Sequence, residues 1–156
     1  MRLVILAVGR LRAGPERTLV EDYLARLAAT GRGIGLEAGG VREIDERKAR
    51  APAAQSAALV AARPADAPLW LLDERGEVLS SPAFARALAD ERDAGTRELA
   101  LAIGGADGGD RALRKTARRT ISLGAMVWPH MLARVMLAEQ LYRAATILAG
   151  TPYHRG

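Results

Sequence analysis

The chain has 156 residues, of which 49% are hydrophobic and 26% are charged, a size and apolar content typical of a single globular domain. The lack of cysteine excludes a disulfide framework, a thiolate nucleophile and a cysteine-based zinc site, so we expect one cytoplasmic domain spanning residues 1–156. No apolar run approaches the roughly 18 residues of a membrane helix. The net charge of +5 is uneven, because residues 111–156 hold 8 basic side chains and 1 acidic one.

Apolar runs alternate with helical patterns along the chain, which predicts an α/β fold with a largely parallel sheet and helices on both faces. The continuous apolar run at residues 3–8 predicts a strand covered on both faces, and Pro15 and Gly31 bound the first helix. The remaining predicted elements are a weak strand within 34–44, a helix over 52–62, a strand over 68–73, a turn at 74–76, a helix over 82–94 with Ser81 as its N-cap, a strand from 98 into a glycine-rich loop, a basic helix over 110–118, a strand over 120–123, a loop over 124–128 and a last helix from Pro129 to Leu148.

The loop AIGGADGGD at residues 102–110 is the first candidate binding element. Ligands of open α/β sheets bind beyond the carboxyl ends of strands, where glycines allow backbone N–H groups to approach a ligand closely. A tight turn that needs positive φ angles explains the same glycines equally well. Their spacing matches neither a dinucleotide-binding loop nor a Walker loop, which argues against a nucleotide- or flavin-binding protein.

The loop SLGAMVWPH at residues 122–130 is a second candidate, because it also follows a predicted strand. Its small and apolar residues could form the wall of an adenine site, to which Leu72 at the end of the third strand could add a contact. Core packing is the alternative for each of these apolar side chains. A common crevice would require the strands before these segments to be neighbours in the sheet.

The last predicted helix contains Glu139, the only acidic residue after residue 110. It lies four residues before Arg143, and an i, i+4 pair of this kind stabilises a helix modestly. A functional interpretation is that Glu139 fixes the guanidinium of Arg143 or of Arg134. The residue spacing alone is compatible with both interpretations.

The chain ends in Tyr153, His154 and Arg155, followed by one glycine. An aromatic ring, an imidazole and a guanidinium in sequence could stack on a base, move a proton and hold a phosphate. A frayed, disordered chain end is the alternative. His130 and His154 are the only histidines and the carboxylates show no ligand-like clustering, so we expect no metal site.

The predicted basic helix over residues 110–118 is a candidate nucleic-acid surface. Spacings of three and four place its basic side chains on one helical face, namely Arg111, Arg114, Lys115 and Arg118. Such a face would bind phosphates and release counterions, which would make the affinity depend on salt. A solvated helix face is the alternative.

Three segments together resemble the bacterial large-subunit ribosomal RNA methyltransferase H family: IGGADG at residues 103–108, ISLGAMVWPHMLARVMLAEQLYRA at 121–144 and the ending TPYHRG. The resemblance extends over essentially the whole chain. It implies an enzyme of the SPOUT class that uses S-adenosylmethionine to methylate N3 of a pseudouridine in 23S ribosomal RNA. It also implies a trefoil knot in the C-terminal part of the chain, which connection rules alone would not predict, and a homodimer with cofactor sites near the subunit interface.

The resemblance also assigns roles to individual residues. It implies cofactor contacts at eight positions, namely Leu72, Gly104, Leu123, Gly124, Ala125, Met126, Val127 and Trp128. It implies substrate or catalytic roles at four positions, namely Arg143, Tyr153, His154 and Arg155. His130 and Glu139 would support them, and His154 would be the base that takes the N3 proton. The sequence departs from the family pattern at Ala106 and Asp107, where a proline and a glutamate are expected, and at Trp128, where a smaller residue is common.

The resemblance leaves the natural substrate open, because the enzyme could act on naked 23S ribosomal RNA, on the large subunit or on the assembled ribosome. Two alternatives remain beside this assignment. One is a SPOUT methyltransferase that acts on another RNA site. The other is a ribosome-binding module without catalytic activity, which would not bind S-adenosylmethionine.

Overall fold

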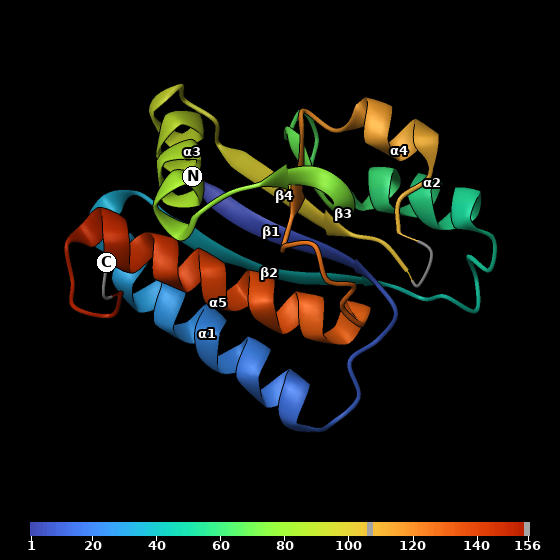
Figure 1. Ribbon diagram of the computed structural model, residues 1–156, viewed down its shortest axis with the longest axis horizontal. Coiled ribbons are helices and arrows are strands. Elements are labelled where there is room, and N and C mark those ends of the chain that lie inside the picture. Colours follow the sequence, from blue (N-terminus) through green and yellow to red (C-terminus); the bar gives the residue numbers. More distant parts are fainter. Residues whose placement is uncertain (106–107, 155–156) are drawn as a thin grey trace.

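The computed structural model describes residues 1–105 and 108–154 of the chain. In these residues, helices alternate with strands in the order expected for an α/β fold (Figure 1). The elements are β1 (Arg2–Val8), α1 (Pro15–Gly31), the 3-10 helix η1 (Arg32–Ile34), β2 (Glu37–Ile44), α2 (Pro52–Ala62), β3 (Leu69–Val78), α3 (Ser81–Asp93), β4 (Glu98–Ile103), α4 (Arg111–Thr116), β5 (Arg119–Ser122) and α5 (His130–Ala149).

The described strands form one five-stranded sheet in the order β2-β1-β4-β3-β5, and all paired neighbours are parallel. This confirms the predicted parallel α/β sheet. The weakly predicted second strand is β2, which lies at one edge and whose side chains are mostly half-buried or exposed. No helix in the described part of the chain combines the length and the apolar character that a membrane span needs.

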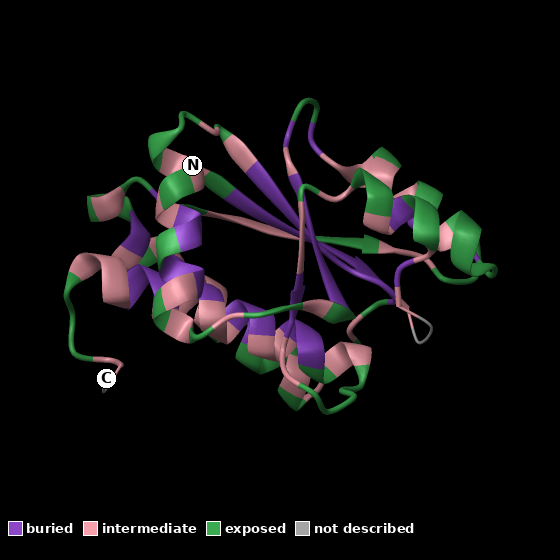
Figure 2. Cartoon of the chain, turned by 45° about the horizontal axis from the view of Figure 1, so that its top comes forward, coloured by how far each residue is buried: buried purple, intermediate pink, exposed green. Residues whose placement is uncertain are grey.

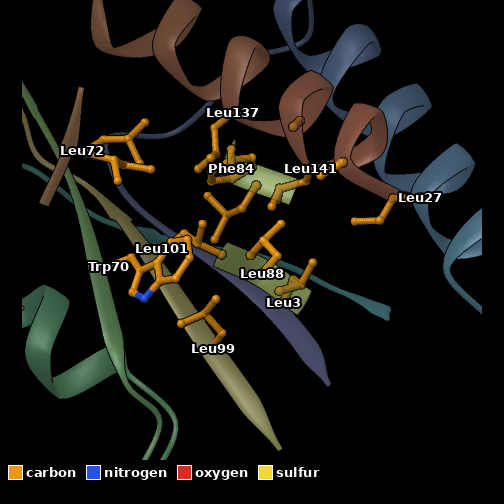
Figure 3. Packing of buried hydrophobic residues seen from close by; sticks show 14 of the residues in the cluster. Leu3, Leu27, Trp70, Leu72, Phe84, Leu88, Leu99, Leu101, Leu137 and Leu141 are labelled. Atoms are coloured by element: carbon orange, nitrogen blue, oxygen red, sulfur yellow. The ribbon is translucent and has the colours of Figure 1, made fainter. Parts of the chain in front are cut away.

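Both faces of the sheet are covered, which explains the continuous apolar run in β1. Leu3 and Ile5 pack with α1, α3 and α5 on one face, whereas Val4 and Leu6 pack with α2 and α4 on the other. Figure 2 shows the buried strands between these helical layers. Figure 3 shows Phe84 of α3 close to Leu137 and Leu141 of α5, whereas Trp70 lies beside Leu99 and Leu101 of the sheet on the same face. Alternating side chains of one strand therefore supply two separate cores.

The turn predicted at residues 74–76 is wrong, because β3 continues to Val78. Both Leu72 and Glu77 are aligned with Ile121 of β5, so the residues between them form an irregularity in the pairing. A Cβ atom on Gly76 would lie 2.5–2.7 Å from three backbone atoms of Ile121. Gly76 is therefore required for close backbone contact with β5, and not for a turn.

Two helix ends also differ from the sequence prediction. The N-cap of α3 is Ser80, whose hydroxyl accepts a hydrogen bond from the Ala83 N–H, and not Ser81. The basic helix α4 ends at Thr116, because Ala117 is extended and the Arg118 N–H donates to the Leu69 carbonyl of β3 at 2.8 Å. Arg118 therefore lies beyond the helix and leads into β5.

Candidate functional site

A cavity of about 280 Å³ lies beyond the carboxyl ends of β4 and β5 and beside residues 72–75 of β3, the strand between them in the sheet. Seven of the eight residues for which the resemblance implies cofactor contacts line it, namely Leu72, Gly104, Leu123, Gly124, Met126, Val127 and Trp128. Ala125 lies in the same loop and is not among the lining residues. The structure therefore brings together segments that are about 50 residues apart in the sequence.

The loop before α5 forms an apolar wall of this cavity. The Ser122 hydroxyl donates to the Gly124 carbonyl at 2.9 Å, and the Gly124 N–H is 3.2 Å from the same hydroxyl oxygen. Gly124 has a φ of +118°, which a residue with a side chain rarely adopts. Met126 and Val127 are 71% and 81% exposed, so these side chains are not part of the core. The core-packing alternative for them is wrong.

The glycine-rich loop forms the opposite wall. A Cβ on Gly104 would lie 2.5 Å from the carbonyl carbon of Gly108, and Gly105 pairs with Gly108 in an isolated bridge. Gly108 has a φ of +71°. The glycines therefore let the backbone fold back on itself, as the tight-turn interpretation requires, and they line the cavity, whereas contact with a ligand stays a prediction. The departures at Ala106 and Asp107 lie outside the described residues.

A buried carboxylate, which the sequence reasoning did not single out, belongs to the cavity wall. The Asp73 side chain is only 2% exposed, and its Oδ2 atom lies 3.3 Å from Nη1 of Arg114. Its Oδ1 atom accepts a hydrogen bond from the Arg75 N–H at 3.0 Å. The signal in the sequence was an aspartate placed directly after the buried run at the end of a predicted strand.

The four basic residues predicted to share one helical face do not form one. Arg114 turns toward Asp73, and Arg118, beyond the end of α4, forms an ion pair with Glu91 at 3.0 Å. Arg111 and Lys115 are exposed on α4. The predicted face is therefore wrong as a single helical surface, because α4 is too short to include Arg118 and a buried carboxylate binds Arg114.

Glu139 is the centre of a second polar cluster, on α5. Its Oε1 atom accepts hydrogen bonds from Nε of Arg143 at 2.9 Å and from the Tyr153 hydroxyl at 3.1 Å. The Arg143 guanidinium also lies over the Tyr153 ring, 4.9 Å from its centroid. Glu139 therefore fixes Arg143 and not Arg134, and it also fixes the tail.

The environment of this cluster favours the protonated forms of Tyr153 and Arg143. Burial and the neighbouring Glu139 carboxylate raise the pKa of Tyr153 to about 12, so its phenol stays protonated at neutral pH. The hydrogen bond to Glu139 raises the pKa of Arg143 further above its usual value. The cluster is thus a fixed cation with a phenol donor, a combination suited to holding a phosphate or a carbonyl oxygen.

The tail is packed over its described part, so a fully disordered chain end is wrong for residues 151–154. The Tyr153 ring lies 4.5 Å from the Tyr142 ring between centroids, and the Thr151 N–H donates to the Thr146 carbonyl at 2.9 Å. His154 Nδ1 is buried and meets no hydrogen-bond partner among the described residues. Arg155 lies outside the described residues.

The polar cluster and the cavity lie at different positions along the axis of α5. Ala133 lines the cavity, and Arg143 follows ten residues later, which is about 15 Å along a helix that rises about 1.5 Å per residue. Figure 1 shows the C-terminal end of α5 and the chain terminus on the side away from the loop that precedes α5. One chain therefore does not bring Arg143 and Tyr153 to its own cavity.

Arg134 is a buried cation that ties the first turns of α5 to the sheet. Its side chain has no exposed surface, and its Nη1 atom lies 2.8 Å from Oε1 of Glu43. Its Nη2 atom donates to the carbonyls of Val8 and Gly9 at 3.1 and 2.9 Å. Burial lowers the pKa of Arg134, and the Glu43 carboxylate opposes this shift. Nothing local in the sequence indicates this pair, because its members lie 91 residues apart.

His130 also lines the cavity, at the start of α5, and its Nε2 atom is buried without a partner among the described residues. A Cβ atom on Gly9 would lie 3.4 Å from it. Within residues 1–105 and 108–154, no three histidine, aspartate or glutamate side chains gather in a way that could hold a metal ion.

Comparison with known proteins agrees with this geometry. A family model described as "Predicted SPOUT methyltransferase" matches residues 1–154. Proteins named "Ribosomal RNA large subunit methyltransferase H" align over 155 residues, which is 99% of this chain and 99% of each relative. The relatives from Dinoroseobacter shibae, Ruegeria pomeroyi and a Ruegeria species are 60%, 61% and 55% identical to the chain.

Proposed function

The chain belongs to the SPOUT methyltransferase family, and we propose that it transfers a methyl group from S-adenosylmethionine to N3 of a pseudouridine in 23S ribosomal RNA. The names of its full-length relatives support methylation of large-subunit ribosomal RNA, and the resemblance of its motifs supplies the atom and the nucleoside. The observation that carries the proposal is the convergence of the proposed cofactor residues on one cavity. A ribosomal substrate would place the enzyme in the cytoplasm.

The residues around the cavity fit the cofactor. The exposed apolar wall of Met126, Val127 and Trp128 offers a surface for an adenine ring, and the glycine-backed wall offers backbone donors and acceptors to polar groups. When bound, S-adenosylmethionine supplies a methyl group that its sulfonium makes electrophilic. The close contact of Gly76 with the β5 backbone places β3 directly against the strand that leads to α5, and the trefoil knot in this part of the chain is what the family resemblance implies.

The tail cluster is suited to binding the target nucleotide. Arg143, oriented by Glu139, would hold a phosphate or a carbonyl oxygen of the base, and Tyr153 would contact the base itself. N3 must lose its proton before it accepts the methyl group, and His154 would take that proton. Arg155 would complete the phosphate contacts.

The distance along α5 supports a homodimer, because the tail cluster of one chain cannot act at the cavity of the same chain. A second copy would supply Arg143, Tyr153 and His154 to that cavity. An apolar groove between α1, α3 and α5 supports such an interface, and Val78 at its rim is 67% exposed. The exposed basic residues Arg111 and Lys115 would bind ribosomal RNA, with Arg118 beside them.

Calorimetry with S-adenosylmethionine tests the cofactor site through Val127→Asp. Val127 lines the cavity but is 81% exposed, so the substitution places a carboxylate in the apolar wall without changing the core. We expect the dissociation constant to rise by at least about tenfold, because the ligand would desolvate a charge, whereas the melting temperature stays unchanged.

Ala57 is exposed on α2 and lines neither this cavity nor the apolar groove, so Ala57→Asp is the control and should leave cofactor affinity unchanged. If wild-type protein does not bind S-adenosylmethionine, the chain is a non-catalytic ribosome-binding module. If Val127→Asp binds it as tightly as wild type does, the cofactor lies elsewhere.

A further inference from the structure

The wall of the proposed cofactor cavity consists of two backbone segments that come from different strands. One is the end of the first part of β3 at Leu72 and Asp73, and the other is the glycine-rich loop after β4. Asp73 is 8% exposed as a whole residue, but its side chain is only 2% exposed. The carboxylate therefore lies behind the wall, where a ligand in the cavity would meet main chain.

One guanidinium nitrogen joins the two segments. Nη1 of Arg114 lies 3.3 Å from Oδ2 of Asp73 and also donates a hydrogen bond to the Gly109 carbonyl. Oδ1 of the same carboxylate accepts from the Arg75 N–H, so Asp73 also fixes the chain immediately after it. Arg114 thus connects the end of β3 to the glycine-rich loop through a buried ion pair.

The described residues of the glycine-rich loop make few side-chain contacts of their own. Its glycines have no side chains that could anchor it, and a Cβ on Gly109 would lie 2.9 Å from a methyl carbon of Leu71. Asp110 anchors the next position by capping α4, where its carboxylate accepts from the Leu113 N–H at 2.7 Å. Among the described residues, the Arg114 bridge is a polar contact that holds Gly109 against β3.

Removing one member of this pair should disturb the cavity more than the fold. Without Arg114, the buried Asp73 carboxylate would keep the Arg75 guanidinium, whose Nη1 atom is 3.8 Å from Oδ1, as its one cation among the described residues, so Asp73 would move toward Arg75 and water or recruit another donor. Either movement would displace the backbone at Asp73 and at Gly109, and a displacement of about 1 Å at a binding site costs substantial affinity. The two cores of the sheet do not include Asp73 or Arg114.

We propose that Asp73 and Arg114 form a buried pair that positions the two backbone walls of the cofactor cavity, so that Arg114 is a positioning residue for the cofactor and not a contact for RNA. This proposal rests on the proposed function. Neither side chain touches the cofactor. Both act through the main chain of the segments that they join.

Arg114→Gln and Arg111→Gln test the proposal as a matched pair, because both remove one arginine from the same short helix. Isothermal titration of the full-length protein with S-adenosylmethionine should give a dissociation constant at least about tenfold higher for Arg114→Gln, and an unchanged one for Arg111→Gln. At saturating cofactor, kcat of Arg114→Gln should remain within about threefold of wild type, so that the weaker cofactor binding appears in the KM for S-adenosylmethionine.

The salt dependence of RNA binding should change in the variant whose cofactor affinity does not, and stay constant in the other. The slope of the logarithm of the binding constant against the logarithm of salt concentration should stay unchanged in Arg114→Gln and should decrease by about one in Arg111→Gln. Arg114→Lys keeps the charge, but its Nζ atom is one bond nearer the main chain than Nη1 and cannot reach both the carboxylate and the carbonyl, so it should also weaken cofactor binding without changing the slope.

Each outcome distinguishes this inference from the proposed function. If wild type does not bind S-adenosylmethionine, the proposed function fails first. If wild type binds it and Arg114→Gln binds it equally well while losing salt dependence, Arg114 is an RNA contact and the positioning role is wrong. If Arg114→Gln does not fold, Asp73→Asn and Arg114→Lys measure the same contact, and wild-type cofactor affinity in both would overturn the proposal.

Discussion

Replacing Gly76 by alanine should destabilise the protein by at least about 3 kcal/mol, the upper end of the range for overpacked sites. The new Cβ would lie 2.5–2.7 Å from the backbone N, Cα and carbonyl carbon of Ile121. Ile121 lies in the edge strand β5, and pairing with β3 on both sides of Gly76 keeps its backbone from moving aside as the tip of a flexible side chain can. Because Leu72 and Glu77 both align with Ile121, the clash would separate β3 from β5 and open the cavity.

Chemical denaturation followed by circular dichroism measures this loss, and Gly33→Ala is the control. Gly33 lies in η1, and a Cβ there would meet no atom within 4 Å. We expect Gly33→Ala to be as stable as wild type or slightly more stable, because alanine restricts the unfolded chain. Equal stabilities for Gly76→Ala and Gly33→Ala would show that the close contact between β3 and β5 is absent in solution.

Replacing Arg134 by methionine should lower the free energy of unfolding by about 3–5 kcal/mol, because it leaves a carboxylate and two carbonyls without their cation. Arg134 has no exposed surface and contacts Glu43, Val8 and Gly9. Since native domains are stable by about 5–15 kcal/mol, this loss is a large fraction of the total. It should also weaken cofactor binding, since α5 begins directly after the cavity loop.

A double-mutant cycle with Glu43→Gln separates the ion pair from the contacts to the carbonyls. The double variant should be more stable than the sum of the two single losses predicts, by about 0.5–3 kcal/mol, because neither charge is then left unpaired. Arg17→Met is the control, since its ion pair with Glu21 on α1 is exposed, and it should leave stability essentially unchanged. Additive losses would mean that Arg134 and Glu43 do not interact.

Local patterns were sufficient to predict most elements of the fold. The apolar run of β1, the proline at the start of α1 and the glycine after α5 correspond to a buried strand, a first turn and a left-handed helix end. These signals depend on neighbours within a few residues. The extension of β3 to Val78 was missed because it depends on pairing with Ile121, which is far away in the sequence.

The candidate site was predictable where it follows the ends of strands. Gly104 and five of the six residues at 123–128 line the cavity because β4, β3 and β5 are neighbours. A common crevice depended on this strand order, which the sequence alone could not establish. Contacts between distant side chains were not predictable. The spacing of Arg114 indicated an exposed helical face, whereas Asp73, 41 residues earlier, binds it at the cavity wall.

Mass spectrometry of ribosomal RNA nucleosides tests the central claim, methylation of a pseudouridine at N3 in 23S ribosomal RNA, most directly. RNA from a strain that lacks this protein should contain one N3-methylpseudouridine fewer than RNA from the parent strain. Wild-type protein should restore the nucleoside, and Val127→Asp, with its obstructed cavity, should not. An unchanged set of methylated nucleosides in the deletion strain would contradict the proposed function.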